Sequence, residues 1–497
     1  MNDNLSPRRE RSGHDLVPFR WRPIGDKVLL TSAFGDWTFV SPDELAAIRR
    51  GEIAPELRGR LSERRFIASE VDFERVRARL THKKRFLNYG PNLHVMVVTL
   101  RCNETCVYCH SSRASMETEG VDMQPAVAEK TVDLILQSTS PRVTIEFQGG
   151  EPLANFPVIQ HVIEYAKQRN ERIGKELEFA LVSNLGMMTE QKLDYLVANR
   201  VQICTSVDGP QPLHDKQRVL AGGSAFREAS RWIAEINRRY VAAGLDPVLY
   251  HVEALLTVTR TALDHPREIV DTYRELGCRA IFLRPLDPFG FAKKKATAAA
   301  IEYERRRYLD FYGQALEYIL ELNRKGEQML ERYAAIFLTK ILTDDDPNFL
   351  DIRSPCGAGI GQLAYNYDGR VFTCDEGRML SHAGDDLFAI GDVRTSRHRE
   401  IVTHETVRAL LAASNLDAQP DCVNCAYNPY CGVCPVHNYA TQGSIHGRMR
   451  ESHLCAVHKG IQDKLFERLA NGDAEELEIL RRWTTVRERA EFVHCPT

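Results

Sequence analysis

The sequence predicts an α/β protein in which a parallel sheet curls into a partial (β/α)6 barrel of the TIM type. Three observations support this prediction. Between residues 93 and 286, apolar stretches alternate with amphipathic helical stretches, and repeated βα units of this kind form parallel sheets. A strands-then-helices pattern precedes this region, which indicates a separate small module. Most cysteines fall in two clusters, near residue 105 and between residues 356 and 455, which indicates metal binding.

Length and composition describe a folded chain of several domains. At 497 residues the chain is too long for one compact core, and its 43% hydrophobic and 27% charged residues are ordinary for globular proteins. A net charge of −3 gives no general attraction to nucleic acid or anionic membranes. The N-terminus shows no signal peptide, and no apolar run approaches the roughly 18 residues that span a bilayer. We therefore expect a cytoplasmic protein with no nucleic-acid or membrane partner, whose thirteen cysteines stay reduced.

The segment before the barrel is expected to form a module over residues 17–88, after a disordered tail of residues 1–16. Short strands are expected around residues 28–31 and 37–40, because apolar and aromatic residues there are bounded by turn signals. Ser41 is placed to cap the first of two short helices that follow.

The barrel is expected to occupy residues 89–300. Its strand candidates are, in order, "LHVMVVTL", "RVTIEFQ", "LEFALVSN", "VQICTSVD", "LYHVEALLTVT" and "AIFLRPL". Helices are expected between them over residues 126–137, 156–168, 190–198, 226–242 and 266–276. Active residues of such barrels lie on the loops that follow the strands.

Three further segments complete the expected organisation. A helical linker over residues 301–350 contains helices at about 301–325 and 327–342, from the apolar periodicity. A cysteine-rich domain is expected over residues 351–460, and a helical tail over residues 461–497.

The loop after the first strand candidate, "RCNETCVYCH", holds Cys102, Cys106 and Cys109. Three thiols cannot all pair as disulfides, and they are one ligand short of a closed zinc site. They could hold three irons of a 4Fe–4S cubane and leave the fourth iron open for a small ligand. A zinc site completed by His110, or reduced structural cysteines, are the alternatives.

The second strand candidate ends in "FQGGEP". Gly149 and Gly150 have no side chains, so the backbone can approach a ligand closely, and Glu151 adds a carboxylate. An ordinary turn would explain the same residues, but the motif follows the three cysteines by only one strand.

The three cysteines, Tyr108 just before the third of them, and the Gly-Gly-Glu-Pro turn together resemble the radical S-adenosylmethionine (SAM) enzymes. That resemblance implies that SAM is the ligand of the open iron. An electron from the cluster would then cleave SAM to a 5′-deoxyadenosyl radical, which abstracts hydrogen from the substrate. It also implies a set of SAM-binding residues: Tyr108, Gly149, Gly150, Glu151, Ser183, Asn184, Ser206, Asp208 and Arg218.

The second cysteine-rich segment resembles the SPASM extension of peptide-modifying radical enzymes, which carries two auxiliary 4Fe–4S clusters. By that resemblance Cys422, Cys425, Cys431 and Cys455 hold an outer cluster, and Cys356, Cys374 and Cys434 hold an inner one with an open iron. Two residues separate Cys431 from Cys434 where the family has three, which puts the ligation of Cys434 in doubt. A structural zinc ribbon is the alternative for these spacings.

Four further residues, one acid and three cysteines, have expected roles. Asp375 follows Cys374 directly, at the position of the proposed proton acceptor in anaerobic sulfatase-maturing enzymes, and a surface acid is the alternative. Cys204 and Cys278 are expected to be packed core thiols, and Cys495 lies in the tail.

The front module resembles the PqqD-like winged-helix domains that bind the leader of ribosomally made precursor peptides, with a structural cap for the barrel as the alternative. The whole arrangement, with "LVPFRWRPIGDKVLLTSAFGDWTFVS", "RRFI" and "CDEGRML", resembles the radical maturase (B component) of the His-Xaa-Ser peptide system. The resemblance implies a three-cluster oxidoreductase that modifies a precursor peptide and takes electrons from a flavodoxin or ferredoxin. A side-chain crosslink is the expected product. A sulfatase-type maturase that makes formylglycine from Ser or Cys, and a zinc-binding peptide scaffold without redox chemistry, are the alternatives.

Overall fold

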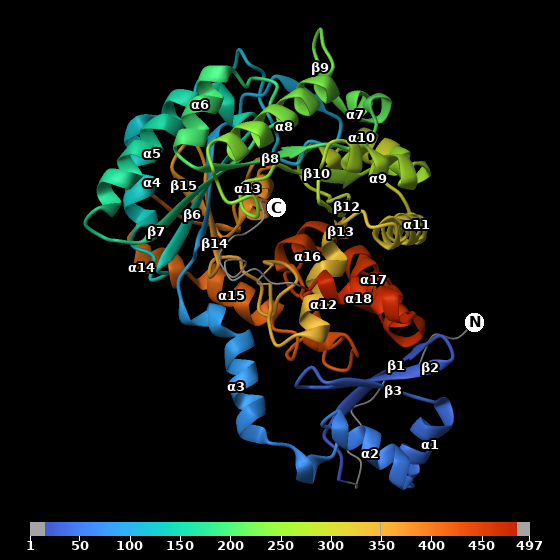
Figure 1. The fold of residues 1–497 in the computed structure, drawn as a ribbon. Helices are drawn as coiled ribbons and strands as arrows, with labels where there is room; N and C mark the ends of the chain where they lie inside the picture. The colour runs from blue at the N-terminus through green and yellow to red at the C-terminus, as the bar shows by residue number, and fades with distance from the viewer. Residues whose placement is uncertain (1–14, 348, 485–497) are drawn as a thin grey trace.

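A nine-stranded mixed sheet lies at the centre of the molecule (Figure 1). The structure is a computed structural model and describes residues 15–347 and 349–484. Across the sheet the strands run in the order β12 (Leu283–Pro285), β10 (Glu253–Val258), β8 (Val201–Ser206), β7 (Glu176–Val182), β6 (Arg142–Gly149), β4 (Leu93–Thr99), β14 (Gln362–Tyr365), β15 (Arg370–Phe372) and β16 (Ala389–Asp392).

The first six of these strands are the six that the sequence predicts, and each pairs with its neighbours in parallel. The parallel arrangement follows from the crossover helices, namely α4 (Pro125–Ile135), α5 (Phe156–Asn170), α6 (Glu190–Ala198), α8 (Ala225–Ala242) and α9 (Pro266–Glu275). Strand β4 is buried along its whole length, as expected for a strand covered on both faces.

The cysteine-rich segment extends the same sheet. The hairpin of β14 and β15 turns at Gly369, whose φ of 93° favours glycine, and β14 pairs in parallel with β4. The Asp368-Gly369 pair is a local turn signal for this hairpin, but no local signal indicates its place beside β4, because that pairing joins residues more than 250 positions apart in the sequence. The sheet is therefore mixed, and the two parts of the chain share one core.

The N-terminal module is a three-stranded antiparallel sheet followed by helices. Strands β1 (Phe19–Ile24), β2 (Lys27–Ser32) and β3 (Trp37–Val40) pair in that order, and α1 (Pro42–Arg50), α2 (Pro55–Glu63) and α3 (Phe73–Lys83) follow. Ser41 caps α1 as predicted, in a reciprocal capping box with Glu44. The expected tail is too long by two residues, since Leu16 bridges Ile67 and Asp15 accepts hydrogen bonds from Ser69.

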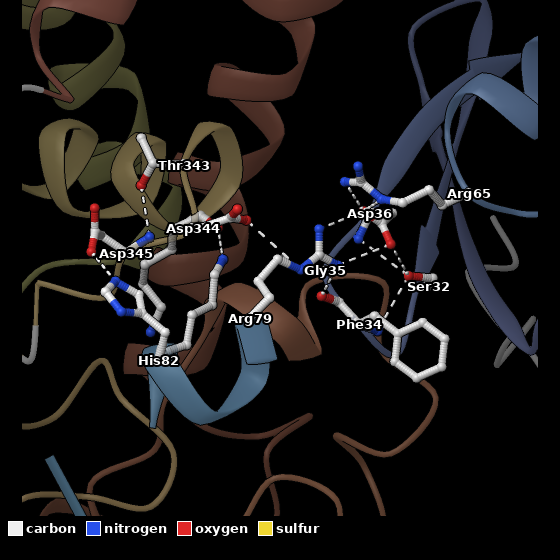
Figure 2. Close-up of polar contacts among 12 residues, drawn as sticks. Ser32, Phe34, Gly35, Asp36, Arg65, Arg79, His82, Thr343, Asp344 and Asp345 are labelled. Atoms are coloured by element: carbon white, nitrogen blue, oxygen red, sulfur yellow. Dashed lines mark hydrogen bonds and ion pairs between the residues drawn. The ribbon is translucent and has the colours of Figure 1, made fainter. Parts of the chain in front are cut away.

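Helix α3 leads from the module toward the central part of the molecule (Figure 1), and its C-terminal half is held by ion pairs. The buried Asp36 carboxylate accepts hydrogen bonds from Arg65 and Arg79, and Arg79 also approaches Asp344 at 3.7 Å (Figure 2). Near the end of the helix, His82 Nε2 lies 2.8 Å from Asp345 Oδ1. These contacts tie the module to the segment that follows α12.

The linker differs from the expected pair of helices. A short helix that was not expected, α10 (Lys295–Ile301), precedes it, and the first expected helix starts about four residues late as α11 (Arg305–Arg324). The second, α12 (Arg332–Leu342), starts five residues late. The expected start is wrong because β13 (Leu330–Glu331) pairs in parallel with β11 (Ala280–Ile281), a long-range contact that local periodicity does not encode.

The cysteine-rich segment also contains four helices that were not expected, α13 (Asp375–Ser381), α14 (His398–Val402), α15 (Glu405–Ser414) and α16 (Pro435–Gln442). The expected helical tail is present as α17 (His453–Asn471), which begins before residue 461, and α18 (Ala474–Arg482). Cys495 lies outside the described residues. No helix in the described part of the chain is long and apolar enough to cross a bilayer.

Candidate active site and cysteine clusters

The loop that carries Cys102, Cys106 and Cys109 starts where β4 ends, as the barrel hypothesis predicts. Its middle forms β5 (Glu104–Cys106), which pairs antiparallel with β9 (Arg218–Leu220). The three thiols are partly buried and none is in a disulfide. Burial, and then the Glu151 carboxylate, raise the pKa of the Cys102 thiol to about 12. Such thiols stay protonated unless a metal replaces the proton.

The Gly149–Gly150 turn is explained by contacts within the chain itself. A Cβ on Gly149 would lie 2.1 Å from the Thr99 carbonyl oxygen, and one on Gly150 would lie 2.4 Å from that of Leu100. Gly150 N–H donates to the Thr99 oxygen, and Glu151 N–H donates to Arg101. The glycines therefore let the end of β6 lie directly against the cysteine loop, which is a different reason from the close ligand approach that the sequence suggests.

The buried Glu151 carboxylate joins two strand ends. It accepts hydrogen bonds from Leu153 N–H at 2.9 Å, from the Ser183 hydroxyl at 2.8 Å and from Asn184 N–H at 2.8 Å. Burial raises the pKa of Glu151, and these three hydrogen bonds lower it. Asn184 Nδ2 then donates to Asn103 Oδ1 at 2.9 Å, inside the cysteine loop. The structure thus brings Glu151, Ser183 and Asn184 together beside Cys102.

Tyr108, Asp208 and Arg218 form a second buried group, beside Cys106. The Tyr108 hydroxyl donates to Asp208 at 2.6 Å, Arg218 Nε donates to Asp208 at 3.0 Å, and the Arg218 guanidinium lies over the Tyr108 ring. Arg218 Nη1 is 4.0 Å from Cys106 Sγ. The cation therefore faces both the carboxylate and the thiol, which suits it to stabilise negative charge on a thiolate-bound group.

Some residues beside the loop of Cys102, Cys106 and Cys109 were not predicted from the sequence. Glu104 is 2% exposed, and its carboxylate accepts a hydrogen bond from the Cys106 thiol at 3.7 Å. Burial raises the pKa of Glu104 to about 7. Gly290 packs so closely that a Cβ would lie 2.2 Å from the His110 carbonyl oxygen. Glu104 lies within the cysteine motif and could have been found there, whereas the approach of Gly290 has no local signal. Ser206 ends β8 beside Leu255 of β10, at the same edge of the sheet.

The four cysteines assigned to the outer cluster line one cavity of about 700 Å3. After burial, the charges of the other three thiols are the main influences that raise the pKa of Cys422. The cavity lies between the C-terminal segment and β1 of the module, since Trp21, Arg22 and Lys459 also line it. Cys422, Cys425, Cys431 and Cys455 are thus gathered at one place.

The three cysteines assigned to the inner cluster lie together elsewhere. Cys356, Cys374 and Cys434 are buried in one apolar cluster with Phe388 and Val436, and they line a cavity of about 30 Å3. Cys434 also borders the outer cavity. After burial, the Cys356 thiol is the main charge that raises the pKa of Cys434. The shortened spacing before Cys434 therefore does not keep it from the inner group.

Asp375 begins α13 and is buried, which excludes the surface-acid alternative. Its Oδ1 accepts a hydrogen bond from Arg378 Nε at 2.6 Å, and its charge raises the pKa of the buried Glu146 on β6. The Arg378 Nη1 and Nη2 atoms have no partner among the described residues. The carboxylates of Asp375 and Glu146 and the guanidinium of Arg378 are therefore all buried, and Asp375 interacts with both of the other groups.

The donor chemistry of the three groups fits iron–sulfur clusters. Each group consists of thiols, the ligands that such clusters use. Among residues 15–347 and 349–484, no three His, Cys, Asp or Glu side chains are arranged to hold a single metal ion. A single zinc ion would need its ligands about 2.0–2.3 Å from one point, a tighter arrangement than a cubane requires.

Comparisons with known proteins agree with this geometry. The Radical SAM superfamily profile matches residues 96–246. A cysteine-type anaerobic sulfatase-maturating enzyme from Clostridium perfringens is 23% identical over 385 residues, which are 74% of this chain and 95% of that enzyme. The radical SAM cyclopropyl synthase TigE of Paramaledivibacter caminithermalis is 28% identical over 151 residues, 27% of this chain and 31% of that one.

Two solved structures share the fold. anSMEcpe with bound AdoMet superposes with a TM-score of 0.65 at 18% identity, over 79% of this chain and 100% of that chain. Streptococcus suis SuiB bound to the precursor peptide SuiA superposes with a TM-score of 0.50 at 12% identity, over 86% of this chain and 97% of that one. The sequence profile therefore identifies residues 96–246 as a radical SAM domain, and the two solved structures share the fold of the chain around it.

Proposed function

We propose that the protein oxidises side chains of a ribosomally made precursor peptide, forming a crosslink, as a relative of the His-Xaa-Ser system maturase. One observation carries the proposal. The three-stranded module of residues 15–88 docks on the cysteine-rich segment, and this chain is longer than the sulfatase-maturating relative that it resembles, because 74% of it spans 95% of that enzyme. SuiB, which also shares the fold, binds a precursor peptide.

Cys102, Cys106 and Cys109 would hold one 4Fe–4S cluster, whose open iron binds SAM. When bound, the cluster and SAM supply the one-electron chemistry that removes a hydrogen atom from the substrate. The residues around them bury the site and set its charge. Arg218 stabilises negative charge at Cys106, and the Glu151 group fixes the cysteine loop against β6 and β7. Gly149, Gly150, Ser206 and Asp208 complete the edge of the sheet at which SAM would bind.

The two other thiol groups would hold the auxiliary clusters. Cys422, Cys425, Cys431 and Cys455 surround one cavity, and Cys356, Cys374 and Cys434 another, with Cys434 bordering both. That arrangement suits stepwise removal of the electron that a substrate radical would give up on oxidation, whereas a flavodoxin or ferredoxin would supply the electron that reduces the first cluster. Asp375 would accept the proton that leaves the substrate, because its second oxygen stays available while Arg378 holds the first.

The front module would bind the leader of the precursor as an added strand. Strands β1 and β3 are the edges of its sheet, and within the described part of the chain each pairs only with β2. An unpaired edge offers backbone donors and acceptors to an extended peptide, and side chains along it provide specificity. The rigid docking of the module would keep the bound leader at a fixed distance from the site.

A sulfatase-type maturase is the second candidate, and the 95% coverage of such an enzyme supports it. Both functions use a peptide substrate and the same hydrogen abstraction. They differ in the product, because formylglycine is an aldehyde and a crosslink is not. A zinc-binding scaffold is less well supported, since the described residues do not converge on a single metal ion.

The test begins with metal content. Anaerobically reconstituted protein should hold about twelve irons, and the Cys102→Ala/Cys106→Ala/Cys109→Ala variant about eight and no SAM cleavage. Bound zinc with about four irons would contradict the auxiliary clusters. The protein is then co-expressed with a candidate precursor peptide, and the product is analysed by mass spectrometry. A crosslink loses two hydrogen atoms and does not react with an aminooxy reagent. A product that reacts would identify the sulfatase-type activity, and an unchanged mass would indicate epimerisation.

A further inference from the structure

The segment of residues 84–92 leads from α3 to β4 (Figure 1), and a cavity of about 140 Å3 lies beside it. The loop before β14 lines the other side of the cavity. Among the described residues, its charged lining consists of three cations, Lys83, Arg85 and Arg353, and one carboxylate, Asp346. A water molecule needs only about 10–15 Å3 of open volume, so this cavity has room for an anion of several heavy atoms.

Arg353 is a buried cation without a hydrogen-bond acceptor. It is 0% exposed, and its Nε, Nη1 and Nη2 atoms have no partner among the described residues. The guanidinium carbon lies 4.1 Å from the centre of the Phe86 ring, which accepts no conventional hydrogen bond. Burial lowers the pKa of Arg353 to about 10, so the group still carries its charge at neutral pH. All five N–H donors of this cation are therefore unsatisfied.

The chain supplies no carboxylate to this guanidinium. Asp346, the acid of the cavity, pairs with Lys340 Nζ at 3.3 Å, and no described residue forms an ion pair with Arg353. The backbone nevertheless leaves space for the cation, since a Cβ on Gly361 would lie 2.6 Å from Arg353 Nη2. Arg353 lines this cavity and not the cavity of the inner thiols. A buried cation without a counter-charge is costly, so its position at the wall of a cavity calls for an anion there.

Lys83 brings a second cation to the same cavity. Its Nζ donates to the Lys340 carbonyl at 3.3 Å, and Lys83 forms no ion pair with a described residue. Burial, and then the charge of Arg79, lower the pKa of Lys83 to about 8. Arg85 Nη2 lies 3.4 Å from Asp345 Oδ1 and adds a third positive charge. Cations gathered in this way give the cavity a positive potential that attracts anions.

We propose that this cavity binds an oxyanion, a phosphate or a carboxylate group, through the Arg353 guanidinium and the Lys83 ammonium. A guanidinium presents parallel N–H donors that match the oxygens of either group. The bound anion joins the end of α3 to the loop before β14, so it holds the segment of residues 84–92 in place. The inference goes beyond the proposed function and does not depend on any metal cluster.

The experiment uses the full chain and follows hydrogen exchange of residues 84–92. Inorganic phosphate and acetate are the two probes, and sodium chloride at the same ionic strength is the reference. We expect exchange to slow several-fold with added anion and then to level off, because a ligand that binds the closed segment makes its opening rarer. The probe that saturates at the lower concentration identifies the source, a free phosphate compound or a carboxylate such as that of an acidic peptide.

Two variants and a control keep the inference testable. In Arg353→Met we expect no response to either anion. Arg142→Met is the matched control and should respond like wild type, because Arg142 begins β6 nearby but pairs with Glu176 and does not line the cavity. If Arg353→Met fails to fold, Lys83→Met gives the answer, since its half-saturating anion concentration should rise about tenfold.

The inference is overturned if neither anion slows exchange beyond the effect of chloride. That result would mean that Arg353 is balanced within the chain. It is equally overturned if the folded variants respond at the same concentrations as wild type, since the anion would then be an adventitious ion on the surface.

Discussion

At the scale of single residues, the close approach of β6 to the cysteine loop depends on the absence of two Cβ atoms. We predict that Gly150→Ala destabilises the protein, because the added methyl would lie 2.4 Å and 2.5 Å from the carbonyl oxygens of Leu100 and Arg101. Backbone atoms cannot move aside as a flexible side chain can, so we expect a cost at the upper end of the usual 1–3 kcal/mol for overpacking.

The measurement is the thermal unfolding of the metal-free variant, with iron content after reconstitution as a second readout. Gly59→Ala is the matched control, since nothing lies within 4 Å of its Cβ position in α2, and alanine is the better helix former. An unchanged melting temperature in Gly150→Ala would mean that the cysteine loop can move away from β6.

At the scale of secondary-structure elements, α3 depends on one buried carboxylate. Asp36 joins Arg65 and Arg79 (Figure 2), and the Arg79 side chain is only 10% exposed. Removing one partner of a buried ion pair costs about 3–5 kcal/mol, so we expect Asp36→Ala to free α3 and to expose the module to protease. Glu74→Ala on the same helix should have almost no effect, since its ion pair with Arg77 is largely exposed.

The same pair gives a pH dependence. Burial raises the pKa of Asp36, but the hydrogen bonds and charges of Arg79 and Arg65 together lower it by more. The pKa of Asp36 therefore lies below the ordinary 3.8. A carboxyl with a depressed folded pKa stabilises the protein above its unfolded pKa and loses that contribution as pH falls through the folded one. The difference in stability between wild type and Asp36→Asn should therefore shrink below about pH 4. A difference that stays constant down to pH 3 would contradict this role.

The elements show why part of the fold can be predicted from sequence. The Ser41 cap and the helix at Glu190–Ala198 depend on local signals, and both are found where they are expected. Strand β13 and the extension of the sheet by β14 depend on pairing with distant segments, and local periodicity does not contain that information. The candidate site follows the same division. Cysteine spacing predicts which thiols gather, whereas the hydrogen bond from Ser183 to Glu151 appears only once the chain is folded.

At the scale of the whole molecule, the front module and the outer thiol group share one interface. The Thr31 hydroxyl donates to the Ala426 carbonyl at 2.8 Å, and Arg20 Nε donates to that of Val423 at the same distance. Both acceptors lie in the short loop that carries Cys422 and Cys425. Arg22 forms a bidentate ion pair with Asp463 of α17, with Nε donating to Oδ1 at 2.6 Å and Nη2 donating to Oδ2 at 2.7 Å. The module is therefore bound to the part of the chain whose shape a metal cluster would fix.

From this interface we predict that loss of the outer cluster loosens the module. In Cys422→Ser/Cys425→Ser the loop loses its metal anchor, so the hydrogen bonds to Thr31 and Arg20 lose their fixed acceptors. Because local opening is set by the stability of such contacts, hydrogen exchange of β1 and β2 should become several-fold faster. The variant lacking Cys102, Cys106 and Cys109 is the control, since it removes a cluster on the other side of the molecule and should leave the exchange of both strands unchanged. Equal exchange in the two variants would mean that the module docks independently of the outer thiol group.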